Sequence, residues 1–480
     1  MILEIKKICC IGAGYVGGPT MAVIADQWPE ITINIVDVNA QRIKDWNDKT
    51  YSKIPVFEPG LEPIIRRCRD RNLHFSTNVK THIAEADMIF ISVNTPTKLN
   101  GIGAGEASDL KWVEACAREV AEYASGHTIV VEKSTLPVKT AKVIKTILDS
   151  SKNPNNLDRE QCSFDVLSNP EFLAEGTAIN DLKYPDRVLI GGENKKAIKA
   201  LINIYKRWVP IEKIISTNTW SSELAKLVAN AFLAQRISSI NSISALCEAT
   251  GADINEVANA IGFDSRIGKK FLISGPGFGG SCFKKDILNL VYLSKQYGIS
   301  SVANYWEGVL KINTWQQHRI SRIIIEKLFG TISAKKISIL GFSFKANTND
   351  TRESSAISIC KDLLNEGALL FIHDPKVDST QVKKDLENIP ISQDETDLCD
   401  RKNPFLGRWE FTNDMEKVFE GSDAVVVLTE WQEYSEIKWE DVVTKMRAPA
   451  WVFDTRSILN SDSVIKSGIN YWRLGVGPNI

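Results

Sequence analysis

Ile8-Cys9-Cys10-Ile11-Gly12-Ala13-Gly14-Tyr15-Val16-Gly17 begins as a short apolar strand and ends in three glycines spaced as Gly-x-Gly-x-x-Gly. A helical segment follows, and Asp37 closes the next apolar run. In this order Gly12 makes the turn, Gly14 admits a pyrophosphate, and Gly17 lets the helix pack on the strand, so that the helix N-terminus faces the phosphates. The stretch predicts a dinucleotide-binding turn in a parallel α/β sheet.

The acid after the second strand indicates which dinucleotide is bound. Asp37 would accept hydrogen bonds from the hydroxyls of the adenosine ribose and would repel a 2′-phosphate. This favours NAD over NADP, although Arg42 keeps NADP open as an alternative. Tyr15 and Val16 lie inside the turn and are expected to contact the cofactor as well.

Around this turn, apolar strands alternate with amphipathic helices, which indicates a parallel sheet covered on both faces. The predicted strands of the first block are residues 8–11, 31–36, 88–93, 128–132, 165–168 and 187–190. A second, smaller block of the same kind has predicted strands at residues 336–341, 369–374, 424–429 and 450–454, with a helix at 354–366. Residues 377–409 are polar and irregular in pattern, and we expect a surface excursion there.

Between the two blocks, residues 220–250 carry apolar side chains at helical spacing without a turn signal. This predicts a helix about 45 Å long, suited to linking two lobes or to packing against another subunit. A mostly helical section continues to residue 333. The expected domains are 1–216, 217–333 and 334–480.

Polar residues follow two of the predicted strands, where open α/β sheets bind ligands. We expect them to line the nicotinamide half of the cofactor. Ordinary turn and helix-capping chemistry is the alternative, because Thr-Pro and Ser-Thr pairs serve both. The candidates are Val93, Asn94, Thr95, Ser134 and Thr135.

Two further pairs of polar residues suggest acid–base chemistry. If residues 169–176 are helical, Glu171 and Glu175 share a face, and one could be a general base while the other binds ribose or substrate. Lys226 and Asn230 lie one turn apart and could offer a cation and an amide to a developing oxyanion. The alternatives are a solvated first turn and a partly exposed helix face.

Cys282 stands apart from the other cysteines because it follows Gly279-Gly280-Ser281. Two glycines allow close approach of a substrate, and Lys284 and Lys285 would favour the nucleophilic thiolate. A buried spacer is the alternative interpretation. The other cysteines lie in predicted strands, helices or polar loops and are expected to be structural.

Composition excludes several classes of protein. With 480 residues the chain is too long for one core, and its formal net charge of -1 favours neither nucleic acid nor an anionic membrane as a partner. No run of about 18 apolar residues could span a bilayer. Nine cysteines without a C-x-x-C pair, and histidines outside all motifs, give neither a disulfide framework nor a metal site. We expect a cytoplasmic protein that binds small molecules.

Taken together in this order, these motifs resemble the UDP-glucose/GDP-mannose dehydrogenase family, and in particular its eukaryotic members that oxidise UDP-glucose. The most specific runs are Phe232-Leu233-Ala234-Gln235-Arg236-Ile237-Ser238-Ser239 and Arg352-Glu353-Ser354-Ser355. The resemblance implies two Rossmann-like doubly wound domains, joined by the long central helix and a helical dimerisation region. It also implies a homodimer, which in animal members often assembles into a hexamer.

The resemblance implies a four-electron oxidation of the sugar C6 alcohol to a carboxylate, with two NAD⁺ consumed and UDP-glucuronate formed. Cys282 would capture the aldehyde as a thiohemiacetal, which then becomes a thioester, and Glu171 would assist the hydrolysis. Lys226 and Asn230 would stabilise oxyanions. Asp286 and Thr135 would hold a catalytic water.

Further contacts are implied residue by residue. Toward NAD, the resemblance adds Glu175, Lys285 and Arg352 to the residues named above. Toward UDP-glucose it implies Glu171, Phe172, Leu173, Lys226, Asn230, Arg266, Phe271, Phe278, Gly279, Phe283, Lys345 and Arg456. Arg266 would reach the sugar across a dimer interface.

The chain departs from the family pattern at three places. Asn347 stands where glycine is frequent, but asparagine tolerates a left-handed backbone, so we expect the turn to survive. Thr455 replaces an expected glycine, and residues 273–276 differ before the cysteine loop. Two alternatives therefore stay open: a dehydrogenase for UDP-N-acetylmannosamine or GDP-mannose, and a non-catalytic subunit that binds NAD and a nucleotide sugar.

Overall fold

The computed structural model describes residues 3–134, 137–150, 162–387 and 407–477. The chain forms two compact units, one made of Met1–Ala229 with Leu288–Leu293, the other of Asn230–Ile287 with Ser294–Ile480. The three-domain division at residues 216 and 333 remains a prediction.

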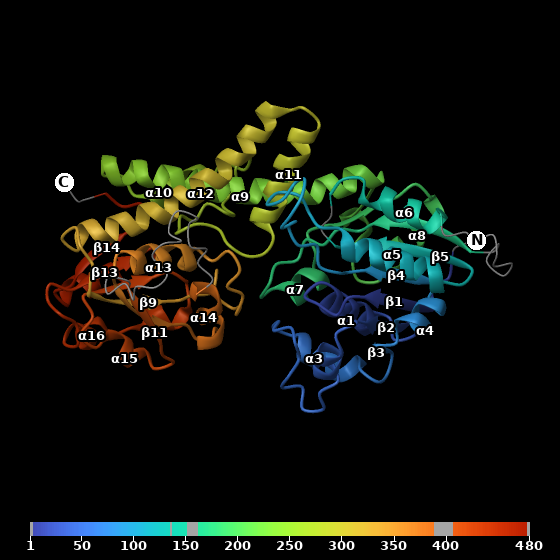
Figure 1. Cartoon of the computed structure of the whole chain (residues 1–480), viewed down its shortest axis with the longest axis horizontal. Helices are drawn as coiled ribbons and strands as arrows, with labels where there is room; N and C mark the ends of the chain where they lie inside the picture. Colours follow the sequence, from blue (N-terminus) through green and yellow to red (C-terminus); the bar gives the residue numbers. More distant parts are fainter. Residues whose placement is uncertain (1–2, 135–136, 151–161, 388–406, 478–480) are drawn as a thin grey trace. The chain divides into compact units, whose positions relative to one another are not determined.

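The first unit is built on a sheet whose strand order is β3-β2-β1-β4-β5-β6-β7-β8 (Figure 1). The strands are β1 (Lys7–Ile11), β2 (Thr32–Val36), β3 (Leu73–Ser76), β4 (Met88–Ile91), β5 (His127–Glu132), β6 (Ser163–Ser168), β7 (Val188–Gly191) and β8 (Ile214–Thr217). The helices are α1 (Gly17–Gln27), α2 (Ala40–Trp46), α3 (Leu61–Cys68), α4 (Val79–Ala84), α5 (Lys111–Tyr123), α6 (Thr140–Ser150), α7 (Ala178–Lys183) and α8 (Lys195–Tyr205).

Both faces of this sheet are covered, as the sequence predicts. Alternate residues of β1 enter different cores: Ile8 and Cys10 join one cluster with helix α1, whereas Cys9 and Ile11 join another with helix α5. A strand buried on both sides must be apolar at every position, which is why this segment reads as a continuous apolar run.

The sequence analysis missed two strands of the first sheet and the direction of one pairing. β3 and β8 have few buried side chains, so they lack the apolar run that marks the central strands. β6 and β7 pair antiparallel at Ser168 and Gly191, while the other neighbouring strands described in this sheet pair parallel. The prediction of a parallel sheet is therefore correct except at this step.

The predicted long helix is confirmed as α9 (Thr219–Thr250), which has 32 residues. Its N-terminus is capped by the Asn218 side chain, which accepts a hydrogen bond of 2.8 Å from the Ser221 N–H. The helical middle section is confirmed by α10 (Ile254–Gly262), α11 (Phe283–Gln296) and α12 (Ser300–Lys327).

The second unit contains a sheet of strand order β11-β10-β9-β12-β13-β14, in which the described neighbouring strands pair parallel. Its strands are β9 (Lys336–Leu340), β10 (Leu369–His373), β11 (Arg408–Phe411), β12 (Ala424–Val427), β13 (Trp451–Asp454) and β14 (Asn470–Arg473). Its helices are α13 (Ser355–Asn365), α14 (Ser379–Glu387), α15 (Met415–Phe419), α16 (Trp439–Val443) and α17 (Ser461–Lys466).

The four strands and the helix predicted here are confirmed, and β11 and β14 were missed. The predicted excursion at 377–409 is wrong at both ends, because α14 occupies its start and β11 begins at Arg408. Both missed strands lie at the edges of the sheet, where half of the side chains stay in water and the apolar pattern is weak. Residues 388–406 lie outside the described residues.

Across the parts of the chain that the structure describes, no helix combines the length and apolar character that crossing a bilayer would require.

Candidate active site

The glycine turn of the first unit has the geometry that a dinucleotide needs. Gly12 has a φ of +110°, and a Cβ there would lie 2.5 Å from the Ser92 carbonyl oxygen. A Cβ at Gly17 would lie 2.1 Å from the Gly12 oxygen, whereas a Cβ at Gly14 would meet nothing within 4 Å. The turn is thus closed on the protein side and open above Gly14, at the N-terminus of α1.

Asp37 holds this turn from the end of β2. One oxygen of its carboxylate accepts from the Ala13 N–H at 3.0 Å, and the other accepts from the Asn39 N–H at 2.9 Å. The Arg42 guanidinium donates to Asp37 at 3.0 Å. Arg42 is thus engaged by the acid that favours NAD, which weakens the NADP alternative.

The end of β4 lies beside this turn because β4 neighbours β1 in the sheet, and β5 is the next strand after β4. The Ser134 hydroxyl donates to the Val93 carbonyl oxygen at 2.7 Å and thereby links the two strand ends. Thr95 is buried and Asn94 is exposed. Tyr15 and Val16 are partly exposed in the turn itself. Thr135, a predicted catalytic and cofactor residue, lies outside the described residues.

Glu171 follows β6 and is bound in a buried polar network. Its carboxylate pairs with the Lys133 ammonium at 2.7 Å and accepts from the backbone N–H groups of Phe172 and Leu173 at 2.8 and 3.1 Å. Lys133 in turn donates to Asn169 and Tyr205. Every polar group of this network therefore has a partner, as a buried cluster requires.

The network keeps Glu171 ionised. Burial by itself would raise the pKa of this carboxyl, but the Lys133 charge and the hydrogen bonds outweigh burial and hold the pKa below its usual range. Burial likewise disfavours the Lys133 ammonium, yet Glu171 and Tyr205 raise the pKa of Lys133. A carboxylate kept charged inside the protein can accept a proton from water.

Residues 169–176 do not form the helix on which the Glu171 and Glu175 prediction depended, because residues 169–174 have no regular secondary structure and α7 begins only at Ala178. Pro170 removes a backbone donor, and the Glu171 side chain binds its own neighbours' N–H groups instead of a helix. The two carboxylates therefore do not share a helix face. Glu175 lies in the turn before α7.

Lys226 and Asn230 are both buried on α9, so the alternative of a partly exposed helix face is wrong for these two side chains. The Lys226 ammonium lies 5.1 Å from the centre of the Phe172 ring, and the Arg187 guanidinium lies 3.8 Å from the same ring. Phe172 is therefore held by two cations in the first unit. Leu173 is packed against the core of that unit.

In the second unit, Asn230 and the start of α11 form one contact. The Asn230 amide donates to the buried Asp286 carboxylate at 2.6 Å, and the Asp286 N–H donates to the Cys282 carbonyl at 2.9 Å. Cys282 is exposed and directly precedes α11, with its Sγ 3.5 Å from the Ser281 hydroxyl. The thiol is thus accessible and lies at a helix N-terminus, the setting of reactive cysteines.

Aromatic side chains surround this cysteine loop. Phe283 lies 6.4 Å from Phe271 and 5.9 Å from Phe278, measured between ring centres. A Cβ at Gly279 would lie 2.6 Å from the Glu353 carbonyl, and the Gly280 N–H donates to the Arg352 carbonyl at 2.8 Å. The glycines therefore let the loop lie against residues 352–353.

Lys284 lies in the first turn of α11, two residues after Cys282. Its ammonium pairs with Glu353 at 2.8 Å, so its charge is already balanced. Lys285 is partly exposed in the first turn of α11. Arg352 binds both oxygens of Asp350, with Nε at 2.8 Å from Oδ1 and Nη2 at 2.7 Å from Oδ2.

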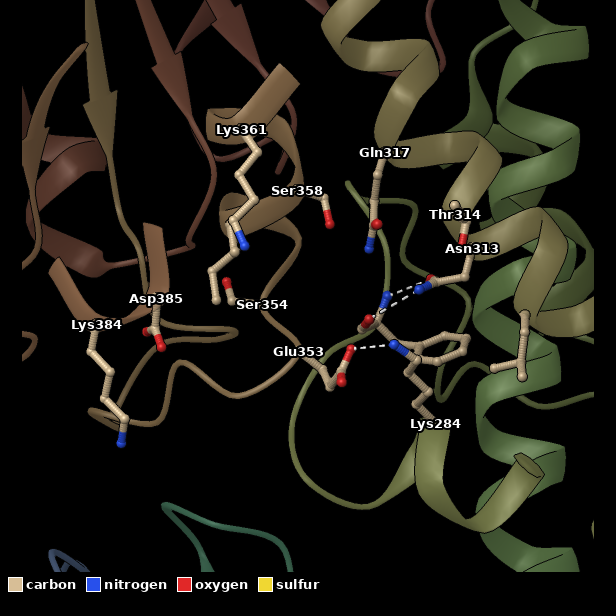
Figure 2. A pocket seen from close by; sticks show the side chains of 13 residues that line it. Lys284, Asn313, Thr314, Gln317, Glu353, Ser354, Ser358, Lys361, Lys384 and Asp385 are labelled. Atoms are coloured by element: carbon tan, nitrogen blue, oxygen red, sulfur yellow. Dashed lines mark hydrogen bonds and ion pairs between the residues drawn. The ribbon is translucent and has the colours of Figure 1, made fainter. Parts of the chain in front are cut away.

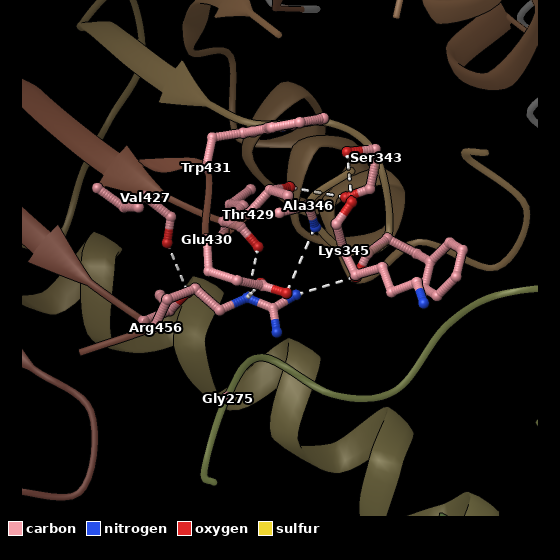
Figure 3. Close-up of polar contacts among 12 residues, drawn as sticks. Gly275, Ser343, Lys345, Ala346, Val427, Thr429, Glu430, Trp431 and Arg456 are labelled. Atoms are coloured by element: carbon pink, nitrogen blue, oxygen red, sulfur yellow. Dashed lines mark hydrogen bonds and ion pairs between the residues drawn. The ribbon is translucent and has the colours of Figure 1, made fainter. Parts of the chain in front are cut away.

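Arg456 follows β13 and is fixed by carbonyl groups (Figure 3). Its guanidinium donates to the Leu428 oxygen at 2.8 Å and to the Phe344 oxygen at 3.1 Å, and pairs with Glu430 at 3.1 Å. Lys345 comes from the adjacent loop, with its ammonium 5.5 Å from the Phe344 ring centre. Both predicted substrate cations thus follow the carboxyl ends of strands of the second sheet, Lys345 after β9 and Arg456 after β13.

Asn347 has a φ of +63°, so the left-handed turn expected of asparagine in this loop is confirmed. Thr455 stands where a glycine was expected. Its side chain is fully buried, and its hydroxyl donates to the Val427 carbonyl oxygen at 2.6 Å, so the fold accommodates a side chain at this position. Arg266 projects into solvent with 88% of its side chain exposed and pairs with Asp264.

Sequence reasoning missed Lys133 as a functional residue. It stands between Glu132 and Ser134 after a buried strand, and a lysine at that place is a signal, because Lys is rarely buried unless paired. Its partner Glu171 is distant in sequence, so only the fold identifies the pair. Within the described ranges no group of His, Cys, Asp or Glu is arranged to hold a metal ion.

The two doubly wound sheets, the glycine turn and the accessible thiol define the class of nicotinamide-dependent oxidoreductases. Models of one family match most of the chain: its NAD binding domain at residues 6–209, its central domain at 220–315 and its UDP binding domain at 338–461. The chain belongs to the UDP-glucose/GDP-mannose dehydrogenase family, and NAD is its cofactor.

Individual relatives agree. UDP-glucose 6-dehydrogenase of Mus musculus is 54% identical over 463 residues, which is 96% of this chain and 90% of the relative. The enzyme of the same name from Caenorhabditis elegans is 52% identical and covers 99% of this chain and 96% of the relative. The resemblance inferred from the motifs is confirmed.

Solved structures share the fold. A UDP-glucose dehydrogenase from Pyrobaculum islandicum superposes with a TM-score of 0.80 at 26% identity, covering 99% of both chains. A UDP-D-ManNAc dehydrogenase from Pyrococcus horikoshii gives a TM-score of 0.78 at 24% identity over 98% of this chain and 99% of that chain. The predicted fold of two parallel-sheet α/β domains with a long central helix is confirmed.

Proposed function

We propose that this chain oxidises UDP-glucose at C6 to UDP-glucuronate and uses two NAD⁺ for each sugar. The observation that carries the proposal is the identity of 50–54% to animal enzymes named UDP-glucose 6-dehydrogenase over nearly the whole chain. The accessible Cys282, placed at the start of α11, supports the covalent route.

The residues around the glycine turn fit NAD. The open space above Gly14 suits a pyrophosphate, and Asp37 at the end of β2 suits the adenosine ribose. We propose that Tyr15, Val16, Val93, Asn94, Thr95, Ser134, Thr135, Glu175, Lys285, Arg352 and Arg42 complete the contacts. Bound NAD⁺ supplies the acceptor for each of the two hydrides that leave C6.

Cys282 makes the second oxidation possible. After the first oxidation, its sulfur bonds to the aldehyde carbon and the thiol proton passes to the carbonyl oxygen, which gives a thiohemiacetal. Loss of a hydride from that carbon and of the hydroxyl proton leaves a thioester. The covalent bond retains the reactive aldehyde while cofactor is exchanged.

Glu171 acts on the last step. As a base it takes a proton from the water that attacks the thioester carbonyl; the C–S bond then breaks, Cys282 regains a proton, and the carboxylate leaves. Its ionised state, maintained by Lys133, supports this role. Lys226 and Asn230 would stabilise the oxyanions, and Asp286 with Thr135 would hold the water.

For the sugar nucleotide we propose the contacts implied by the resemblance. In the second unit, the aromatic rings of Phe271, Phe278 and Phe283 with Gly279 would lie along the sugar, and the cations Lys345 and Arg456 would bind the uracil–diphosphate part. Phe172, Leu173 and Arg266 would complete the set.

The test is the ratio of products. Two NADH per UDP-glucose are expected, with no turnover of UDP-N-acetylmannosamine or GDP-mannose; a ratio of one would contradict the four-electron route. Cys282→Ala should abolish formation of UDP-glucuronate, whereas Cys162→Ala, which removes a half-buried thiol of the first unit, should leave it unchanged. Turnover by Cys282→Ala would remove this residue from its role.

We also propose that the chain is a homodimer through α9 and that dimers assemble further into a hexamer. Leu246 and Phe232 on this helix are 58% and 56% exposed, which is unusual for large apolar side chains on a lone subunit. Leu246→Lys should reduce the mass measured by light scattering, and Arg266→Ala should weaken binding of UDP-glucose if Arg266 reaches a partner's site. An unchanged mass for Leu246→Lys would contradict the α9 interface.

The cytoplasm is the compartment we propose, because the nucleophile must remain a free thiol and reducing conditions protect it.

A further inference from the structure

A cavity of about 480 Å³ lies in the second unit between helices α12 and α13, with the C-terminal part of α14 at its rim (Figure 2). Its volume falls in the range of small-molecule sites. Of the residues that line it, only Phe278 belongs to the substrate contacts proposed above. The cavity therefore has no assigned ligand.

Two helices present matching faces to this space. Leu310, Asn313, Thr314 and Gln317 follow one another at intervals of three, one and three residues on α12. Ser354, Ile357, Ser358 and Lys361 have the same spacing at the start of α13. Residues spaced in this way lie on one side of a helix, so the walls of the cavity are two rigid surfaces.

The floor of the cavity is fixed by hydrogen bonds. The buried Asn313 side chain accepts from the Phe278 N–H at 2.8 Å and donates to the Phe278 carbonyl at 3.1 Å. The Gln317 amide donates to the Ser355 hydroxyl at 3.2 Å. These side chains hold the walls together and keep the space open.

The charges that line the cavity are not balanced within it. It has three lysines and two carboxylates, Glu353 and Asp385. Lys284 pairs with Glu353 at 2.8 Å, and Asp385 accepts from the Gln381 amide and the Thr351 hydroxyl. Lys361 and Lys384 have neither an ion pair nor a hydrogen bond among the described residues.

Lys361 is the more constrained of these two cations. It is half-buried on the face that α13 turns to the cavity, one turn from the Ser358 hydroxyl, whereas Lys384 is exposed at the rim. A partly buried ammonium without a counter-charge attracts an anion. Ser358 and Thr314 add hydroxyl donors nearby, and Leu310 with Ile357 gives an apolar wall.

We propose that this cavity binds a small phosphorylated metabolite, with a phosphate group on Lys361 and Ser358 and an apolar body against Leu310 and Ile357. Lysine suits phosphate as a point charge, and the Ser358 hydroxyl beside Lys361 in the lining can donate to a phosphate oxygen. The cavity shares only Phe278 with the proposed NAD and sugar-nucleotide contacts.

The Lys284–Glu353 pair limits how tightly the ligand binds. Lys284 lines the cavity but forms an ion pair with Glu353. An incoming phosphate therefore competes with the Glu353 carboxylate for the Lys284 ammonium. Removing the Glu353 charge should release Lys284 to the ligand. Variants at Lys361 and Glu353 should therefore change the affinity in opposite directions.

The experiment is a calorimetric titration of inorganic diphosphate into the full chain saturated with NADH and UDP, so that the family's own sites are filled. One further site per chain is expected, with a Kd of about 1 mM or tighter. Lys361→Gln should weaken it at least about tenfold, Lys361→Arg should retain it, and Glu353→Gln should tighten it severalfold.

The control removes two charges elsewhere: Lys195→Gln with Lys199→Gln on the exposed face of α8 should bind as the parent does. Ser358→Asp places a negative charge in the cavity and should abolish binding, which keeps a second test available if Lys361→Gln does not fold. No binding by the parent at about 10 mM diphosphate, or parent-like binding by Lys361→Gln or Ser358→Asp, would overturn the proposal.

Discussion

The first turns of the two sheets follow the same plan but serve different ligands. Gly12 after β1 and Gly341 after β9 have φ values of +110° and +93°. The Gly12 N–H donates at 2.8 Å to the carbonyl of Val36, the last residue of β2, and the Gly341 N–H donates at 2.8 Å to the carbonyl of His373, the last residue of β10. In the first unit α1 begins at Gly17, whereas in the second α13 begins only at Ser355. The longer connection carries Lys345 and Arg352.

The acids that follow the second strands differ in the same way. Asp37 accepts from the Ala13 N–H and from Arg42, whose side chain is 43% exposed, and is itself 9% exposed. Asp374 is 1% exposed and binds the N–H groups of Phe342 and Ser343 as well as the Trp431 indole. The first acid is available to a ribose, and the second has become a structural support for a loop.

The two units thus differ in the length of the connection between the first strand and the helix that follows it. A short turn leaves a helix N-terminus for a pyrophosphate, while a long one replaces it with side chains that bind a different nucleotide. The variants below test this difference, from the largest expected effect to the smallest.

Asp374→Ala should be the most destabilising change, with a loss of about 4 kcal/mol of unfolding free energy, because several buried donors lose their acceptor. Asp37→Ala should cost about 1 kcal/mol and act mainly on NADH affinity. Urea unfolding followed by tryptophan fluorescence measures the first effect, and Trp431 reports on the Asp374 site directly. Equal losses of stability in the two variants would contradict the structural role of Asp374.

Lys133→Met should cost about 3 kcal/mol at neutral pH, because it leaves the Glu171 charge buried without its partner. The Lys133 charge lowers the Glu171 pKa, so the pair stabilises the fold above the ordinary carboxyl range, and this stability is lost as the pH falls through the folded-state pKa. The cost should therefore shrink in acid. In a plot of the UDP-glucose oxidation rate against pH, the fall in rate on the acid side should also move to higher pH in Lys133→Met, because the Glu171 pKa is no longer lowered by Lys133.

Arg456→Met is the matched change after β13 of the second sheet. Its guanidinium binds carbonyl oxygens and is less deeply buried, so the loss of stability should be smaller and the loss of UDP affinity larger. If Arg456→Met left UDP binding unchanged, the assignment of this edge to the sugar nucleotide would be wrong.

Gly12→Ala and Gly341→Ala should each cost about 2 kcal/mol, because a Cβ would strain a positive φ and lie 2.5 Å from Ser92 or 2.3 Å from Thr429. Gly12→Ala should reduce NADH affinity and spare UDP, and Gly341→Ala should do the reverse. Gly14→Ala is the control: its Cβ meets nothing within 4 Å, so stability should persist while NADH affinity falls. Titration calorimetry with each ligand distinguishes these outcomes.

Glu132→Gln should have the smallest effect and depend on pH. Burial first, and then the nearby charge of Glu223, raise the pKa of Glu132. The protonated carboxyl therefore favours folding at low pH, and this contribution is lost as the pH rises through the folded-state pKa. The variant should match the parent at pH 5 and be roughly 1 kcal/mol more stable at pH 8. A constant difference between these pH values would contradict the raised pKa.

Much of the fold was predictable from local sequence. The central strands of both sheets, α9 and the glycine turn were predicted because apolar runs, helical spacing and glycine positions are local signals. The edge strands β3, β8, β11 and β14 were not, since an edge strand gains its stability from the strand beside it. The Lys133–Glu171 ion pair was missed for a related reason, because its partners are distant in sequence.

The sequence by itself determined the class of cofactor, the doubly wound plan of both sheets and the accessible cysteine, because each depends on residue type and short spacing. Only the tertiary structure decided which charges are balanced: Lys284 is held by Glu353, Lys133 by Glu171 and Arg42 by Asp37, while Lys361 faces a cavity without a counter-ion among the described residues. The physical reason is that the effect of a charge depends on its distance from other charges and from water, and folding sets both distances.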